Sequence, residues 1–211
     1  MSARNKWKQF LAAALVICGC FLLGRGAREI FDSYWGQKEA TKQFETSKRL
    51  EASKRRPRVP THRRLQLGEA VAKLSIPRLG AKLYVVEGTD TRDLRLGPGH
   101  MPGSALPGED GNCVIAGHRD THFRVLREIR QGDEIDLETP EGRFVYTVDG
   151  TQIVRPTDVS ILKPSQSGIL HLITCYPFYF LGHAPKRFIV DAKLEPPLSA
   201  AVHSPHSASS N

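Results

Sequence analysis

Cys175 is a candidate reactive residue, because it lies where a mostly apolar predicted strand ends. The run Ile169–Thr174 precedes it, and Pro177, two residues later, cannot continue a central β-ladder. Strand ends and the loops after them are where a rigid scaffold presents reactive groups. A thiol acts as a nucleophile when a base or a positive charge lies near it, because its reference pKa is about 8.5. The alternative is a small buried apolar residue, the commonest fate of a free cysteine.

His118 is the histidine best placed to serve such a thiol. It follows the apolar segment Cys113–Ala116 at a Gly-His-Arg-Asp turn that leads into a predicted helix. His118 and His122, four residues apart, could alternatively bind a metal ion. No third ligand with matching spacing follows, so the sequence predicts no metal site.

Arg187 opens the last predicted strand, twelve residues after Cys175. A hairpin across residues 176–186 would set the start of this strand beside the end of the cysteine strand. A guanidinium there could donate hydrogen bonds to an oxyanion or to substrate carbonyls. For any single arginine, a solvated position at the rim of the sheet is the alternative.

The cysteine count limits the redox chemistry. Cys18 and Cys20 lie in an N-terminal apolar run, so only Cys113 and Cys175 remain in the candidate domain. They allow a single disulfide or a lone functional thiol, and no Cys-x-x-Cys pair indicates a structural zinc site.

The segment 65–194 must position these side chains. Its sequence predicts short strands separated by turns. Pro140-Glu141-Gly142 and Asp149-Gly150 are hairpin signals. Two short helices are predicted, over residues 89–94 and from residue 120 or 121 to 129. About eight short strands with few helices indicate an all-β barrel or sandwich. The predicted strands are Ala70–Ile76, Leu83–Val86, Asn112–Ala116, Glu134–Leu137, Arg143–Val148, Thr151–Val154, Ile169–Thr174 and Arg187–Lys193.

The net charge of +8 belongs to the N-terminal third of the 211-residue chain. Residues 1–64 hold 15 Lys and Arg against 5 Asp and Glu, whereas residues 65–211 hold 15 against 17. A nucleic-acid-binding domain carries its positive charge on the fold, so this distribution argues against one.

The N-terminal region divides into a short tail (1–9), an apolar segment (10–26) and a polar, basic linker (27–64). The apolar segment could be a cleaved signal peptide, a lipoprotein signal or an uncleaved membrane anchor. An anchor is favoured, because an arginine interrupts the small-x-small cleavage signal. The linker reads as a solvated spacer, helical up to about Ser53, or as a polybasic stretch on anionic lipid. Residues 195–211 read as a disordered tail.

Three linked motifs resemble those of the sortase family. They are the segments 117–121 (GHRDT), 172–178 (LITCYPF) and 184–188 (APKRF). The residues of the last two motifs resemble the class D type. The resemblance covers roughly residues 70–193, with the motifs in family order and spacing. Two positions depart from the pattern: His171 stands where a threonine is expected, and His122 where an aromatic or apolar residue is expected.

The resemblance implies an eight-stranded sortase-type β-barrel with one or two short helices, preceded by a membrane anchor helix. It implies a single-pass protein of the cytoplasmic membrane whose catalytic domain (65–194) lies outside the cell. Cys175 would attack a Leu-Pro-x-Thr-Gly/Ala-like sorting signal of a secreted protein, and an amine of the cell envelope would resolve the thioester. His118 would act as acid and base, Arg187 would bind the oxyanion with Thr174 assisting in substrate binding, and no cofactor would be needed.

Two other functions remain open. One is a different cysteine peptidase or transpeptidase of the cell envelope, such as an L,D-transpeptidase, although the Ser-x-Gly-Cys and His-Gly signatures of that family are absent. The other is a membrane-tethered β-barrel binding module without catalysis, in which His118, Cys175 and Arg187 are incidental.

Overall fold

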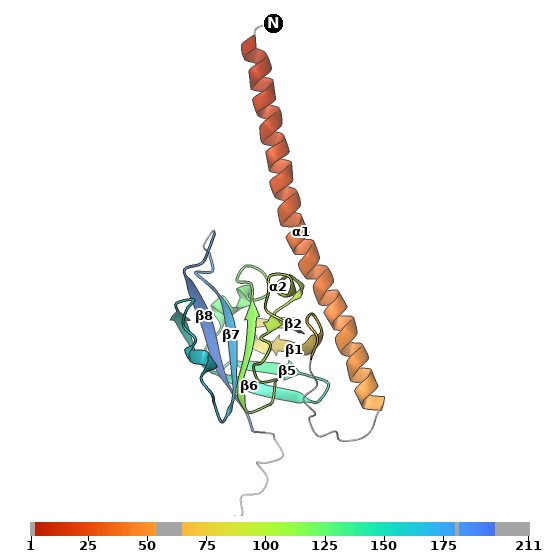
Figure 1. Ribbon diagram of the computed structural model, residues 1–211, viewed down its shortest axis with the longest axis vertical. Helices are drawn as coiled ribbons and strands as arrows, with labels where there is room; N and C mark the ends of the chain where they lie inside the picture. Colours follow the sequence, from red (N-terminus) through yellow and green to blue (C-terminus); the bar gives the residue numbers. More distant parts are fainter. Residues whose placement is uncertain (1–2, 54–64, 180–181, 197–211) are drawn as a thin grey trace, which may run out of the picture.

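Eight strands close into a barrel in the computed structural model, which describes residues 3–53, 65–179 and 182–196 (Figure 1). The strand order around the barrel is β1-β2-β3-β4-β7-β8-β6-β5. The predicted all-β barrel with few helices is confirmed. The strands are β1 Ala70–Ile76, β2 Ala81–Glu87, β3 Gly99–His100, β4 Gly111–Gly117, β5 Glu134–Glu138, β6 Arg143–Val154, β7 Gly168–Tyr176 and β8 Lys186–Leu194. The helices are α1 Ala3–Ser53 and α2 Asp93–Leu96, with 3-10 turns at Pro77–Leu79, Arg124–Glu128 and Ser160–Leu162.

One predicted turn is wrong. Asp149-Gly150 does not end a strand, and β6 runs unbroken through it. Both halves of β6 pair with β8, and the register shifts between Val148 and Gly150. The glycine therefore marks a bulge that bends the strand, which a local turn signal cannot distinguish from a hairpin. The eighth strand is instead the two-residue β3, which the sequence did not predict.

Alternating side chains fill the barrel. Leu170 and Leu172 of β7 and Cys113 and Ile115 of β4 are buried in one apolar cluster. Phe123, from the turn after β4, is fully buried in the same cluster. A Cβ atom on Gly117 would lie 2.6 Å from the Phe123 ring, so only glycine allows this close approach where β4 ends.

The C-terminal half of α1 packs on the barrel, although the sequence suggested a solvated spacer there. Figure 1 shows this half running beside β1, β2 and α2, while the N-terminal half projects away from the barrel. Ala40 and Phe44, four residues apart on one helix face, are buried against Ala70 and Val86. Gln37 adds a hydrogen bond between α1 and the residues at the end of α2, because its side chain donates to the Leu96 carbonyl at 2.9 Å. Two apolar residues in a polar segment are a weak sequence signal, so only the tertiary contact reveals this face.

Glu138 on β5 ties α1 to the barrel electrostatically. It accepts hydrogen bonds from Lys48 of α1 and, at 3.4 Å, from Lys73 of β1. The bond from Lys48 is the main cause of the lowered pKa of Glu138. Within the described residues, no helix combines the length and the apolar character needed to cross a bilayer.

Candidate active site

The ends of three adjacent strands bring the predicted site residues to one edge of the barrel. β4 and β7 run parallel, with Gly117 opposite Thr174, so His118 follows directly beside the end of β7. β7 and β8 are antiparallel and lie side by side in Figure 1. Their register places Cys175 opposite Arg187. The hairpin predicted from the twelve-residue spacing is therefore confirmed.

Cys175 points to the outer face of β7. Leu170 and Leu172 face the barrel interior, and the two-residue period of a strand then turns Cys175 outward, on the same face as His171. Its side chain is half-buried and forms no disulfide. A half-buried thiol at a strand end can be reached by a substrate.

Thr174 points the other way and is almost fully buried. Its hydroxyl donates to the Gly117 carbonyl at 2.7 Å. The hydroxyl therefore fixes β4 to β7 next to His118, and it is not turned toward the face that carries Cys175.

Cys113 is not a partner for Cys175. It is a free, buried thiol in the barrel interior. Burial, with a smaller contribution from the negative charges of Glu109 and Glu87, raises its pKa far above the ordinary value. The disulfide alternative is thus wrong, and Cys113 is an inert core residue.

His122 is neutral in the folded chain. Burial, and secondarily the nearby His118, lowers its pKa from 6.5 to about 4. It is therefore unsuited to deliver a proton near neutral pH. Among the residues that the structure describes, no three His, Cys, Asp or Glu side chains are grouped to bind a metal ion.

We expect the free energy of unfolding to decrease in acid, because the pKa of His122 is lower in the folded chain than in the unfolded chain. Between pH 6.5 and about 4 the unfolded chain binds a proton that the folded chain does not, so stability decreases as the pH falls through this window. The full loss is roughly 3 kcal/mol. His122→Phe should flatten this dependence, measured as urea unfolding at pH 7 and pH 4.5. His183→Phe, at an exposed position, is the control and should lose as much stability between pH 7 and pH 4.5 as wild type does. The same loss in His122→Phe would contradict the expectation.

Arg119 fixes the loop after Cys175, a role that the sequence did not assign. Its guanidinium donates to the Pro177 carbonyl at 3.1 Å and to the Gly182 carbonyl at 2.9 Å. Arg119 follows His118 directly, so one turn carries both the histidine and the side chain that holds the opposite loop. Its place inside the Gly-His-Arg-Asp motif was the only available signal.

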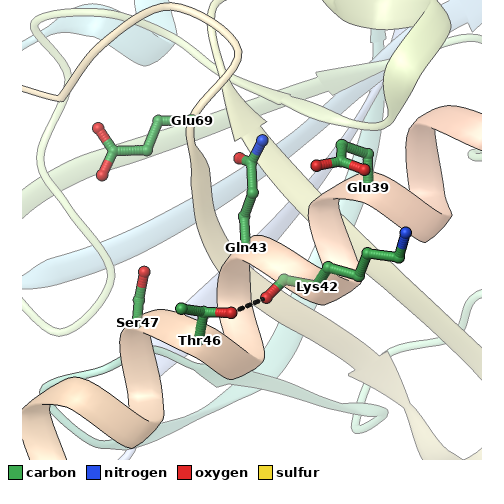
Figure 2. A pocket seen from close by; sticks show the side chains of 6 residues that line it. All are labelled: Glu39, Lys42, Gln43, Thr46, Ser47 and Glu69. Carbon is green, nitrogen blue, oxygen red and sulfur yellow. Dashed lines mark hydrogen bonds between the residues drawn. The ribbon is translucent and has the colours of Figure 1, made fainter.

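A cationic hollow of about 180 Å³ lies beside this loop. Its lining includes Arg127, which donates to the Tyr179 hydroxyl at 2.9 Å. The full lining is Arg119, Asp120, Arg124, Arg127, Phe178 and Tyr179. A larger hollow of about 340 Å³ lies between α1 and Glu69, and Figure 2 shows that its walls are polar side chains of α1 such as Gln43 and Lys42. Cys175, His118 and Arg187 line neither hollow.

The comparisons with known proteins agree with this geometry. The family model described as the Sortase domain matches residues 74–195. The chain is 43% identical over 129 residues to Sortase D of Bacillus subtilis and 31% identical to Sortase A of Listeria monocytogenes. These matches cover 61% and 59% of this chain, but only 65% and 56% of the two relatives.

Solved structures show the same fold. A Clostridium perfringens Sortase D5 transpeptidase has a TM-score of 0.62 at 25% identity, covering 78% of this chain and 99% of that one. Listeria monocytogenes sortase A has a TM-score of 0.55 at 30% identity, covering 60% of this chain and 88% of that one. Together with the family model, which spans more than half of the sequence, these matches show that the chain belongs to the sortase family.

Proposed function

We propose that the chain is a cysteine transpeptidase whose reacting groups are Cys175, His118 and Arg187. The observation that carries the proposal is the pairing of Cys175 with Arg187 across β7 and β8, with His118 beginning beside the end of the same strand. A nucleophile, an acid–base group and a cationic hydrogen-bond donor on neighbouring strand ends are the parts that acyl transfer needs.

The chemistry proceeds in two steps. The Cys175 thiolate attacks a backbone carbonyl of the substrate, and Arg187 donates hydrogen bonds to the oxyanion that forms. His118 gives a proton to the departing amine as the C–N bond breaks, which leaves a thioester on Cys175. An incoming amine then attacks the thioester while His118 takes its proton, so a new amide forms and Cys175 is released as the thiolate.

The substrate proposed is an extended, Leu-Pro-containing sorting signal of the Leu-Pro-x-Thr-Gly/Ala type on a secreted protein. An apolar binding surface is available where β6 ends beside Arg187, since Val154 pairs with that arginine. Val159 and Leu162 are exposed in the loop after β6. These side chains fit the apolar residues of such a signal, and an amine of the cell envelope would be the acceptor.

We further propose that the apolar segment of α1 holds the enzyme at the cytoplasmic membrane, with the barrel outside the cell. Leu15, Val16, Ile17 and Phe21 are all exposed on this segment. It lies in the half of α1 that projects away from the barrel (Figure 1). Recovery of the full chain with the membrane fraction, and its release on deletion of residues 1–26, would support this attachment. A full chain that stays in the soluble fraction would refute it.

The transpeptidase proposal is tested by incubating the full chain, in detergent, with Leu-Pro-x-Thr-Gly and Leu-Pro-x-Thr-Ala peptides and an added amine. Mass spectrometry should show the peptide fragment ending in threonine attached to Cys175 as a thioester. It should also show the same fragment joined to the amine. A protein that binds the peptides without cleaving them would be a binding module, and the proposal would fail.

A further inference from the structure

A chain of hydrogen bonds crosses four neighbouring strands on the face that carries Cys175. The Gln152 amide on β6 donates to Asp191 Oδ2 on β8 at 2.7 Å. Asp191 Oδ1 lies 2.6 Å from His171 Nδ1 on β7, and His171 Nε2 lies 3.4 Å from Asn112 Oδ1 on β4. The Asn112 amide nitrogen then donates to the backbone carbonyl of Lys163 at 2.5 Å. His171 is the centre of this chain and is nearly buried.

The direction of every bond follows from its two ends. A carbonyl only accepts, so the bond to Lys163 requires the NH₂ group of Asn112, and the Asn112 oxygen must then face His171. A carboxylate likewise accepts, so His171 Nδ1 must carry a proton toward Asp191. His171 Nε2 lies toward the Asn112 oxygen, so the ring joins the carboxylate of Asp191 to the amide of Asn112.

The chain ends on the loop that borders the candidate site. Residues 155–167 leave the sheet beside Arg187, because Val154 is paired with that residue. They rejoin it at Gly168, at the opposite end of β7 from Cys175. Asn112 is paired with Ile169, so its bond to the Lys163 carbonyl fastens the loop near that far end. The segment 155–163 therefore runs about 20 Å along β7, from the Cys175 end to the Asn112 tether.

We propose that His171 is a positioning residue, which through Asn112 holds the segment 155–163 in place beside the Cys175 face. The inference rests on the proposed function for its effect on substrate. His171 lies four residues before Cys175, about 13 Å along the strand, so it does not touch the reacting atoms. Its influence reaches the substrate through Val159 and Leu162, which are exposed on the tethered segment. Releasing the tether should therefore weaken substrate binding and leave the chemical step unchanged.

One carboxylate and one amide contact the His171 ring. Asp191 on β8 is the acidic group in contact with it. On β4 the neutral amide of Asn112 contacts the ring, and on β6 the neutral amide of Gln152 binds Asp191. Lys163 contributes its carbonyl oxygen to the chain. Lys193, the next residue on this face of β8, forms its own ion pair with Asp149 at 3.0 Å.

Three variants of the full chain separate the tether from general destabilisation. Asn112→Ala removes the contact with His171 and the bond to the Lys163 carbonyl. Asn112→Asp keeps an acceptor for His171 and loses only the donor to Lys163. His171→Thr removes the centre of the chain. Ser165→Ala is the control, because its hydroxyl bonds only within the same loop, to Ser167.

We expect hydrogen exchange of the amides in residues 157–163 to be at least about fivefold faster in the three variants than in wild type and Ser165→Ala. The KM for the sorting peptide should rise about tenfold in the same variants, with kcat within twofold. Asn112→Asp should resemble Asn112→Ala in exchange and KM.

Unchanged exchange in the Asn112 variants would overturn the tether. A loss confined to kcat would overturn the positioning role. Unchanged exchange in His171→Thr would overturn the role of His171 in holding Asn112. The exchange measurements need no turnover, so an inactive wild type would refute the proposed function alone.

Discussion

Cys175→Ala is expected to abolish thioester formation and to lower peptide cleavage by at least about 10⁴-fold. Cys175 is the outward-facing, half-buried thiol on β7, and alanine leaves no nucleophile at the end of that strand. Peptide binding should survive, because the substitution removes one atom from a surface position. Acyl-enzyme mass and product release measure the first effect, and fluorescence anisotropy of a labelled peptide measures the second.

Cys113→Ala is the matched control. Cys113 is buried in the barrel interior on β4, and burial holds its thiol neutral. Its removal should lower stability by about 1 kcal/mol, as small core truncations do, and leave the thioester intact. Cleavage that persists in Cys175→Ala, or that disappears in Cys113→Ala while the protein stays folded, would reassign the nucleophile.

The convergence of the site was predictable because it depends on strand order and spacing. Arg187 follows Cys175 by twelve positions, and a proline-interrupted loop separates two apolar runs, so a hairpin is the simplest connection, and the register confirms it. The parallel pairing of β4 with β7 is a long-range contact that the residues alone do not specify. The resemblance of the three motifs to one family implied the barrel, but no prediction named this pairing.

The sequence was least informative where polar side chains make the contacts. Gln37, in the segment interpreted as a spacer, bonds to Tyr84 and Leu96, which lie 47 and 59 residues away. An exposed glutamine on a helix has the same local pattern. His171 was noted only as a departure from the family motif, because its partners Asp191 and Asn112 come from other strands. Such networks depend on the complete sheet order, which no local window contains.

Arg187→Ala is expected to lower kcat/KM by about 10² to 10³-fold, the usual cost of losing one donor to an oxyanion. Arg187→Lys should recover only a small part of this loss, because an ammonium cannot reproduce the planar, two-pronged donor of a guanidinium. Two hydrogen bonds hold the guanidinium in one orientation. Arg187 Nη1 donates to the Lys186 carbonyl at 3.1 Å and to the Ala184 carbonyl at 3.4 Å. The guanidinium is thereby oriented by its own loop before a substrate arrives.

Lys186→Ala controls for charge alone, since Lys186 is the neighbouring exposed cation on β8 and opposes Tyr176 rather than Cys175. It should stay within twofold of wild type in kcat/KM. An equal loss in Lys186→Ala and Arg187→Ala would mean that the strand end acts through its net positive charge. A loss confined to Arg187, falling mainly on kcat, would place this guanidinium at the transition state, in agreement with its position opposite Cys175.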